Sequence, residues 1–243
     1  MSKKKLVVLS GAGISVESGI APFRGTGGLW NNEELAKMAT VEAWRTKTAE
    51  VLEFYNQRRS YLQEVEPSSA HLLLAKMERD YDVVILTQNV DDLHERAGST
   101  NVIHLHGELT KARPEDVYND ADGFCEEEVV NIRYKEIHLG DTGRKNHSQL
   151  RPHIVFFGEP VPMIHHAQRQ VAEADILLIV GTSLQVYPAA GLLQFAPENS
   201  EIFVIDPEKP AAVLSRSIHY IKQKATIGME EFARSIGFSI SDR

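Results

Sequence analysis

The sequence predicts an α/β fold built around a doubly wound parallel sheet, with a smaller lobe formed by two insertions. Four short runs are rich in valine, isoleucine and leucine and show little polar alternation, as expected for parallel strands covered on both faces. They span residues 6–9, 83–86, 176–180 and 202–205. Helical patterns lie between these runs at residues 70–79 and 163–174. Strands that alternate with helices in this way are typical of a doubly wound sheet.

Two stretches interrupt this alternation and indicate the smaller lobe. Residues 34–65 are helical throughout, and residues 109–150 are polar and rich in acidic side chains. Residues 102–105 and 154–156 are weaker strand candidates. We therefore expect two domains. The sheet domain takes residues 1–33, 66–108 and 151–243, and the small lobe takes residues 34–65 and 109–150.

Composition narrows the class of protein. The chain has 243 residues, of which 42% are hydrophobic and 25% are charged, as in an ordinary globular protein. Its net charge of −8 argues against nucleic acid as the main partner. The apolar run at residues 6–9 is too short for a signal peptide or a membrane span, and a single cysteine, Cys125, allows no intramolecular disulfide. We expect a cytoplasmic protein without a membrane partner; its oligomeric state is not indicated.

A glycine-rich turn follows the first strand. Gly11, Ala12 and Gly13 form a Gly-x-Gly turn, typical of a Rossmann-like sheet, whose glycines let the backbone approach a pyrophosphate at a helix N-terminus. The third glycine of the dehydrogenase pattern is replaced by Val16. The competing interpretation is a tight strand-to-helix turn. Residues 20–30 then carry Phe23 and Arg24 in a loop that we expect to close over a ligand.

These segments resemble the sirtuin family of NAD-dependent protein deacylases. Residues 11–15 read Gly-Ala-Gly-Ile-Ser, residues 17–20 read Glu-Ser-Gly-Ile, and residues 23–24 read Phe-Arg, as in that family. The resemblance extends over nearly the whole chain with the motifs in family order. It implies NAD as a consumed co-substrate. The N-terminal residues implied in its binding are Gly11, Ala12, Gly13, Glu17, Ile20, Phe23 and Arg24.

A polar Gln-Asn-x-Asp motif follows the second predicted strand, at its carboxyl end. Gln88 and Asn89 offer donors and acceptors for ribose hydroxyls, and Asp91 can accept from a carboxamide. The competing interpretation is a cap on the helix that begins at Asp92. The resemblance to sirtuins implies that this motif holds the nicotinamide ribose, and that Asp91 and the backbone of Ile20 hold nicotinamide.

Two histidines end the next predicted strand. Histidine suits general-base catalysis because its pKa lies near neutrality, although a histidine at a strand end is more often structural. His104 and His106 alternate onto the same face, so periodicity does not choose between them. The family's catalytic histidine directly precedes a glycine, which implies His106. In the implied mechanism the acyl oxygen attacks the ribose carbon that bears nicotinamide, and His106 then removes a ribose hydroxyl proton. Water completes the reaction to lysine, nicotinamide and O-acyl-ADP-ribose.

Further cofactor contacts are expected after the later strands. Gly181, Thr182 and Ser183 suit phosphate or ribose contacts, or equally a helix start. Asp206 can accept from ribose hydroxyls at a position where sirtuins usually have asparagine. Ala225 matches a family alanine near the adenine, although its flanking residues do not match.

A Tyr-x-x-Arg pair bears on which acyl group the protein would remove from lysine. Tyr55 and Arg58 share a helix face, and a phenol beside a guanidinium suits a carboxylate, although such pairs are common on solvated helices. In sirtuins this pair, with a small residue at Ala39, marks the subgroup that handles succinyl-, malonyl- or glutaryl-lysine. The resemblance also implies that the backbone of Phe157 and Gly158 pairs with an extended acyl-lysine peptide. A buried strand end is the competing interpretation.

The second insertion departs from the family. Most sirtuins bind structural zinc there through two Cys-x-x-Cys pairs, and a chain with only Cys125 cannot form a four-thiolate site. We expect no zinc and an apolar cluster in its place. Val130, Ile132 and Tyr134 alternate with polar residues, which predicts a strand, and Ile137 and Leu139 resume in the opposite phase. The alternative is a metal held by Cys125, Asp122, His138 and His147, a spacing that matches no known pattern.

Two other functions compete with deacylation on the same motifs. One is an NAD-dependent ADP-ribosyltransferase, and the other is a catalytically silent NAD-binding module. A hydride-transfer dehydrogenase ranks below both because the third glycine is missing.

Overall fold

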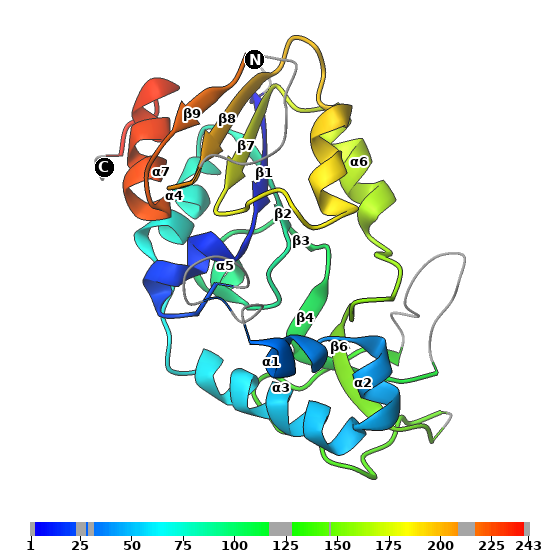
Figure 1. Cartoon of the computed structure of the whole chain (residues 1–243). Helices are drawn as coiled ribbons and strands as arrows, with labels where there is room; N and C mark the ends of the chain where they lie inside the picture. Colours follow the sequence, from blue (N-terminus) through cyan, green and yellow to red (C-terminus); the bar gives the residue numbers. More distant parts are fainter. Residues whose placement is uncertain are drawn as a thin grey trace.

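A six-stranded parallel sheet forms the centre of the larger part of the molecule (Figure 1). The computed structural model describes residues 3–22, 28, 32–116, 128–145, 147–208 and 217–240. The strand order is β3-β2-β1-β7-β8-β9. The strands are β1 (Lys5–Ser10), β2 (Asp82–Thr87), β3 (Val102–His104), β7 (Ile176–Val180), β8 (Glu201–Ile205) and β9 (His219–Ile221). All five predicted strands of this sheet are confirmed, and the short β9 is the strand that the sequence did not predict.

The strand order reverses at β1, which pairs with β2 on one side and with β7 on the other. Ser10 lies opposite both Thr87 and Val180, so the carboxyl ends of the three strands are level. In open α/β sheets ligands bind in the crevice outside such a reversal. The topology therefore places the ligand crevice where the Gly-x-Gly turn, the Gln-Asn-x-Asp motif and the Gly-Thr-Ser segment begin.

Helices cover both faces of the sheet (Figure 1). Alternate residues of the strands belong to two separate hydrophobic cores, one on each face. Leu6 and Val8 of β1 point to one face, where they share a core with α4 (Ser69–Met77) and α7 (Ala225–Ser235). Val7 and Leu9 point to the other face, against α6 (Ile164–Ala172) and the 3-10 helix η4 (Ala189–Phe195). Burial on both faces explains why these strands read as continuous apolar runs.

Three helices and an antiparallel sheet lie beside the carboxyl ends of the parallel strands, and we call them the small lobe (Figure 1). The helices are α1 (Glu33–Lys37), α2 (Val41–Thr46) and α3 (Thr48–Leu62). The sheet has the order β5-β4-β6, with β4 (Gly107–Pro114), β5 (Val130–Asn131) and β6 (Leu150–Ile154). The helical stretch is confirmed. The weak strand candidate at residues 154–156 is wrong in its bounds, because β6 ends at Ile154 and belongs to this second sheet.

Helix α3 holds the second insertion through a buried asparagine. The side chain of Asn56 donates to the carbonyl of Ile137 at 2.9 Å and accepts from its N–H at 3.0 Å. Arg59 is fully buried, donating through Nη1 to Asn56 at 2.7 Å and through Nε to the carbonyl of Leu109 at 2.7 Å. The expected strand from residue 130 to 134 is wrong in length. Its pairing stops at β5 because Arg133 takes a left-handed φ of 52°.

The apolar cluster expected in the second insertion forms only in part. Ile137 is buried in the core of the small lobe, and Val130, Ile132 and Tyr134 pack against that core. Leu139 does not join it, because 60% of its surface is exposed. No helix among the described residues combines the length and apolar character that crossing a membrane requires.

Candidate active site

A cavity of about 1040 Å³ lies between the carboxyl ends of the parallel strands and the small lobe. Its size is at the upper end of the range for ligand pockets. All the predicted site residues that the structure describes line it; Phe23 and Arg24 lie outside the described residues. The lining residues that the sequence predicted are Gly11, Ala12, Gly13, Glu17, Ile20, Ala39, Tyr55, Arg58, Gln88, Asn89, Asp91, His106, Phe157, Gly158, Gly181, Thr182, Ser183, Asp206 and Ala225.

The glycine turn is fixed by close contact with the end of β7. A Cβ added to Gly11 would lie 2.7 Å from the carbonyl oxygen of Gly181. A Cβ added to Gly13 would lie 2.5 Å from the Cα of Gly181. The N–H of Gly13 also donates to the carbonyl of Gly181 at 2.8 Å. Chain packing alone therefore requires glycine at both positions. The helix that follows is the 3-10 helix η1 (Ala12–Ser18).

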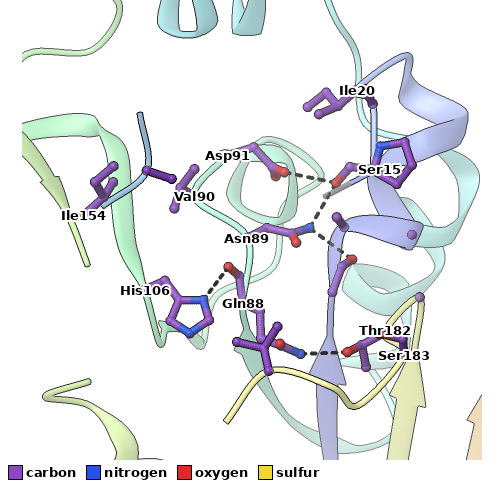
Figure 2. A pocket seen from close by; sticks show the side chains of 18 of the residues that line it. Ser15, Ile20, Gln88, Asn89, Val90, Asp91, His106, Ile154, Thr182 and Ser183 are labelled. Atoms are coloured by element: carbon purple, nitrogen blue, oxygen red, sulfur yellow. Dashed lines mark hydrogen bonds between the residues drawn. The ribbon is translucent and has the colours of Figure 1, made fainter. Parts of the chain in front are cut away.

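The Gln88–Asp91 loop is held by a chain of hydrogen bonds (Figure 2). The amide of Gln88 donates to Thr182 Oγ1 at 3.1 Å. The buried amide of Asn89 donates to the carbonyl of Gly11 at 3.3 Å and to Ser15 Oγ at 3.1 Å. Ser15 in turn donates to Asp91 Oδ2 at 3.0 Å. These bonds join the ends of β1, β2 and β7 into one polar floor of the cavity.

Two details of this floor differ from the sequence interpretation. Ser15 was not predicted as a site residue, yet it connects Asn89 to Asp91. Asp91 Oδ1 also accepts at 3.2 Å from the N–H of Leu93, the first residue of the next helix, whose N-cap is Asp92; the expected start at Asp92 is wrong by one residue. Burial raises the pKa of Asp91 to about 6, although the Leu93 N–H and the Ser15 hydroxyl counteract this rise.

His106 projects into the cavity from the turn after β3 (Figure 2). Its Nδ1 lies 3.0 Å from the backbone carbonyl of Gln88, and a carbonyl can only accept, so Nδ1 carries the proton. Nε2 is then left as the basic nitrogen. Burial lowers the pKa of His106, which keeps the ring neutral near pH 7. The next residue, Gly107, has a φ of +76°, and a Cβ there would lie 2.2 Å from the carbonyl oxygen of His153.

His104 has different partners, although it shares a strand face with His106. Its Nδ1 lies 3.0 Å from the carbonyl of Asn89 and its Nε2 lies 2.8 Å from Glu95 Oε1. It is not among the residues that line the cavity. Of the two histidines, the structure therefore places His106 against the cavity and His104 away from it, and the catalytic role of His106 stays a prediction.

The acidic residues that line the cavity include Glu17, which follows β1, and Asp206 and Glu208, which follow β8. Asp206 Oδ1 accepts from the N–H of Glu208 at 2.9 Å, and burial raises the pKa of Asp206. The carboxylate of Glu17 accepts from the N–H of Thr226 at 2.9 Å and from its hydroxyl at 2.7 Å. It therefore ties η1 to the first turn of α7, beside the buried Ala225. This second role of Glu17 was not predicted from the sequence.

Tyr55 and Arg58 of α3 line the part of the cavity that the small lobe forms. Tyr55 is only 6% exposed and packs edge-on against Phe54, with ring centroids 4.9 Å apart. The guanidinium of Arg58 lies 3.5 Å above the Phe54 ring. Burial raises the pKa of Tyr55 and lowers that of Arg58. Within the part of the chain that the structure describes, neither side chain has a carboxylate partner.

The predicted peptide-pairing segment already pairs within the chain. Phe157 donates its N–H to the carbonyl of Ala39 at 2.8 Å, and its carbonyl accepts from the N–H of Val41 at 3.0 Å. Ala39 thus supports Phe157 as well as lining the cavity. Among the described residues, none bonds to the backbone of Gly158, whose φ is +94°. Of the two predicted residues, Gly158 is therefore the one with backbone groups open to a peptide.

Comparison with known proteins identifies the family. Residues 11–188 match the sequence model of the Sir2 family. The chain belongs to the Sir2 family. A relative from Bacteroides thetaiotaomicron, described as an NAD-dependent protein deacylase, is 47% identical over 230 residues, or 94% of this chain and 96% of the relative. The resemblance to sirtuins and the α/β fold class are confirmed.

Solved structures of Sir2 homologues share the whole fold with this Sir2-family chain. A mutant of one homologue, in complex with ADP-ribose, has a TM-score of 0.84 and 34% identity, covering 98% of this chain and 96% of its own. Another homologue, in complex with NAD, has a TM-score of 0.82 and 35% identity, covering 96% of this chain and 90% of its own.

The residues of this Sir2-family chain do not fit the four-thiolate zinc site of most sirtuins, because the sequence contains one cysteine. In the described ranges no three histidine, cysteine, aspartate or glutamate side chains gather as a metal site would require. The alternative metal set falls partly outside these ranges, since Asp122 and Cys125 are not described.

Proposed function

We propose that this Sir2-family chain is an NAD-dependent protein-lysine deacylase in which His106 is the general base. The proposal rests on the position of the His106 ring. Its Nδ1 is hydrogen-bonded to the Gln88 carbonyl, and the ring lines the cavity. This leaves Nε2 as the free base. The deacylase activity named for the relative that is 47% identical supports the same reaction.

The polar floor of the cavity fits NAD. Hydroxyl and amide groups at the strand ends suit ribose and phosphate oxygens, and the carboxylate of Asp206 suits a ribose hydroxyl. NAD supplies, when bound, an activated ribose carbon with nicotinamide as its leaving group. The residues that would hold it are Gly11, Ala12, Gly13, Glu17, Ile20, Gln88, Asn89, Asp91, Gly181, Thr182, Ser183, Asp206 and Ala225.

The chain contributes proton transfer and orientation. His106 Nε2 takes a proton from a ribose hydroxyl, and the positive charge that forms on the ring is stabilised by the Gln88 carbonyl, which still accepts from Nδ1. Asp91 accepts from the carboxamide of nicotinamide in its ionised form, which prevails above a pH of about 6. The small lobe excludes water by covering the cavity on the side away from the sheet.

The second part of this proposal is that the protein prefers acyl groups that carry a carboxylate. Tyr55 and Arg58 present a hydroxyl and a guanidinium to the cavity. Neither group is paired with a carboxylate of a described residue. A succinyl or malonyl carboxylate would accept from both, while its alkyl chain lies against Leu109, Ile154 and Phe156. The expected substrates are acidic acyl-lysine proteins or peptides, bound partly through the backbone of Gly158.

A panel of matched acetyl-, succinyl- and malonyl-lysine peptides with NAD tests both parts. We expect nicotinamide release with all three peptides and the highest kcat/KM with the acidic groups, while product masses show O-acyl-ADP-ribose and free lysine. Release without deacylated peptide, or ADP-ribose attached to a protein, would favour the transferase. Binding of NAD with no turnover on any peptide would favour the silent binding module.

The small lobe is held without zinc in this proposal. The pairing of Asn56 with the backbone of Ile137 attaches the second insertion to α3. Arg151 adds a two-pronged ion pair to Glu159, at 2.6 and 2.9 Å. Elemental analysis of the purified protein should find far less than one zinc per chain, and a stoichiometric amount would contradict this proposal.

A further inference from the structure

His104 and His106 bind successive carbonyls of the same loop. Nδ1 of His106 lies 3.0 Å from the carbonyl of Gln88, and Nδ1 of His104 lies 3.0 Å from the carbonyl of Asn89. Each carbonyl can only accept, so each Nδ1 must carry a proton. The two rings thus hold the backbone of Gln88 and Asn89 in place, and with it the side-chain amides of both residues.

The second nitrogen distinguishes the two rings. Nε2 of His104 lies 2.8 Å from the carboxylate of Glu95, and His104's side chain is only 6% exposed. An ionised carboxylate can only accept, so Nε2 of His104 must carry a proton as well. His104 is therefore a charged imidazolium paired with Glu95. His106 has no such second partner among the described residues and remains neutral.

We propose that His104 and Glu95 form a charged pair that positions the Gln88–Asp91 loop for the deacylation reaction. His104 is a positioning residue, because it acts through Asn89 rather than touching the ligand cavity. Held by its carbonyl, Asn89 directs its amide to Gly11 and to Ser15. Ser15 then donates to Asp91, so the pair acts on the nicotinamide end of the site through three successive hydrogen bonds.

The charge on His104 also acts on Asp91 through space. Several titratable groups face His104 from the elements packed against it: Glu95 and His94 of α5 (Leu93–Arg96), Glu108 of β4, His153 of β6, and Asp91 itself. Burial opposes charge on His104, but Glu95 and Glu108 raise its pKa above the ordinary value. The pKa values of His94 and His153 are both lowered, mainly by burial, so these rings are neutral. The His104 charge lowers the pKa of Asp91, and removing it should raise that pKa.

The test compares His104→Leu, His104→Gln and Glu95→Gln with wild type, using nicotinamide release with a succinyl-lysine peptide at a series of pH values. His104→Leu and Glu95→Gln should lower kcat/KM for NAD by about 10- to 100-fold and move the acid limb of the profile to higher pH. His104→Gln keeps a donor for the Asn89 carbonyl and should retain more activity than His104→Leu. His165→Gln, on the exposed side of α6, is the matched control and should behave as wild type.

A direct readout avoids dependence on folding of the variants. In wild-type protein with 15N-labelled histidine rings, His104 should show two protonated nitrogens through the pH range of activity, and His106 should show one. A singly protonated His104 at pH 7 would overturn the proposal. So would folded His104→Leu and Glu95→Gln proteins with wild-type kcat/KM and an unmoved acid limb.

The inference rests on the proposed function, and the two fail differently. A wild-type protein that deacylates no peptide refutes the function, but it leaves the ring protonation and the NAD affinity measurable. Calorimetry should then still find weaker NAD binding for His104→Leu than for wild type. Equal affinities would refute the positioning role on its own.

Discussion

The two ends of the cavity differ in how their polar groups are satisfied. At the sheet end, Gln88, Asn89 and Asp91 are held by hydrogen bonds to Thr182, Ser15 and backbone groups of the chain. At the acyl end, Arg58 rests on the Phe54 ring and makes one long hydrogen bond, 3.4 Å to the Phe54 carbonyl. The hydroxyl of Tyr55 has no hydrogen bond to any described residue.

This difference in hydrogen bonding indicates that the sheet end is preorganised for the reaction, while the acyl end is suited to recognising a ligand. Groups that are bonded to one another before a ligand arrives keep their geometry and require little reorganisation during reaction. Donors that line a cavity without a protein acceptor gain most from a ligand that supplies one, so they discriminate between ligands with and without an acceptor. The sheet end should therefore determine whether the reaction occurs, and the acyl end should determine which acyl group reacts.

The largest effect is expected from His106→Ala. Loss of the general base should lower deacylation of every acyl peptide by about 10²- to 10⁴-fold, without changing their relative rates. Parallel assays of nicotinamide and free lysine with acetyl and succinyl peptides measure this. His165→Ala, on the exposed side of α6, is the control. Near wild-type rates in His106→Ala would remove the assigned base.

A selective effect is expected from Arg58→Met. Loss of the charge-assisted hydrogen bonds should lower kcat/KM for a succinyl peptide by about 10- to 100-fold and leave the acetyl peptide unchanged or improved. Gln57→Met is the matched control, because Gln57 is the exposed neighbour of Arg58 on α3. Equal losses for both peptides would show that Arg58 supports the fold rather than the acyl group.

The sheet end should also show a pH dependence that the acyl end lacks. Burial raises the pKa of Asp91 to about 6, so its carboxylate ionises as the pH rises through that value. Affinity for NAD should therefore fall as the pH is lowered from about 7 to about 5. Calorimetry measures this, and Asp91→Asn should bind weakly with no slope over the same range. A slope that persists in Asp91→Asn would assign the titration to another group.

The smallest effect concerns stability. Asn89→Ala should lower the free energy of unfolding by about 1 to 3 kcal/mol, because it leaves the buried Gly11 carbonyl and Ser15 hydroxyl short of a donor. Tyr55→Phe removes a hydroxyl without a hydrogen-bond partner among the described residues and should change stability by less than about 1 kcal/mol. Urea unfolding of both variants compares them. A larger loss for Tyr55→Phe would contradict the distinction between the two ends.

The sheet was predictable from the sequence because its strands are buried on both faces. The 3-stranded sheet was not, since β4 mixes buried Arg113 and Thr110 with apolar residues and follows no simple period. The strand predicted from residue 130 failed because Arg133 takes a left-handed backbone conformation that the polar-apolar alternation does not reveal.

The residues that line the cavity were predictable, but their partners within the chain were not. The glycines of the turn were expected to make room for a phosphate, whereas the structure adds a close approach to Gly181 from a strand far along the chain. The different surroundings of His104 and His106 likewise depend on Glu95 and on two carbonyls, which only the folded chain brings together.

Helix α3 divides two tasks between adjacent faces. Tyr55 and Arg58 face the cavity, while Asn56 and Arg59, one position further along, hold the second insertion and β4. If Tyr55 and Arg58 recognise the acyl group as proposed, substrate choice can change through two positions whose side chains make no hydrogen bond to the second insertion or β4 among the described residues. On that proposal, changing one face of α3 and keeping the other would alter the acyl preference without loosening the small lobe.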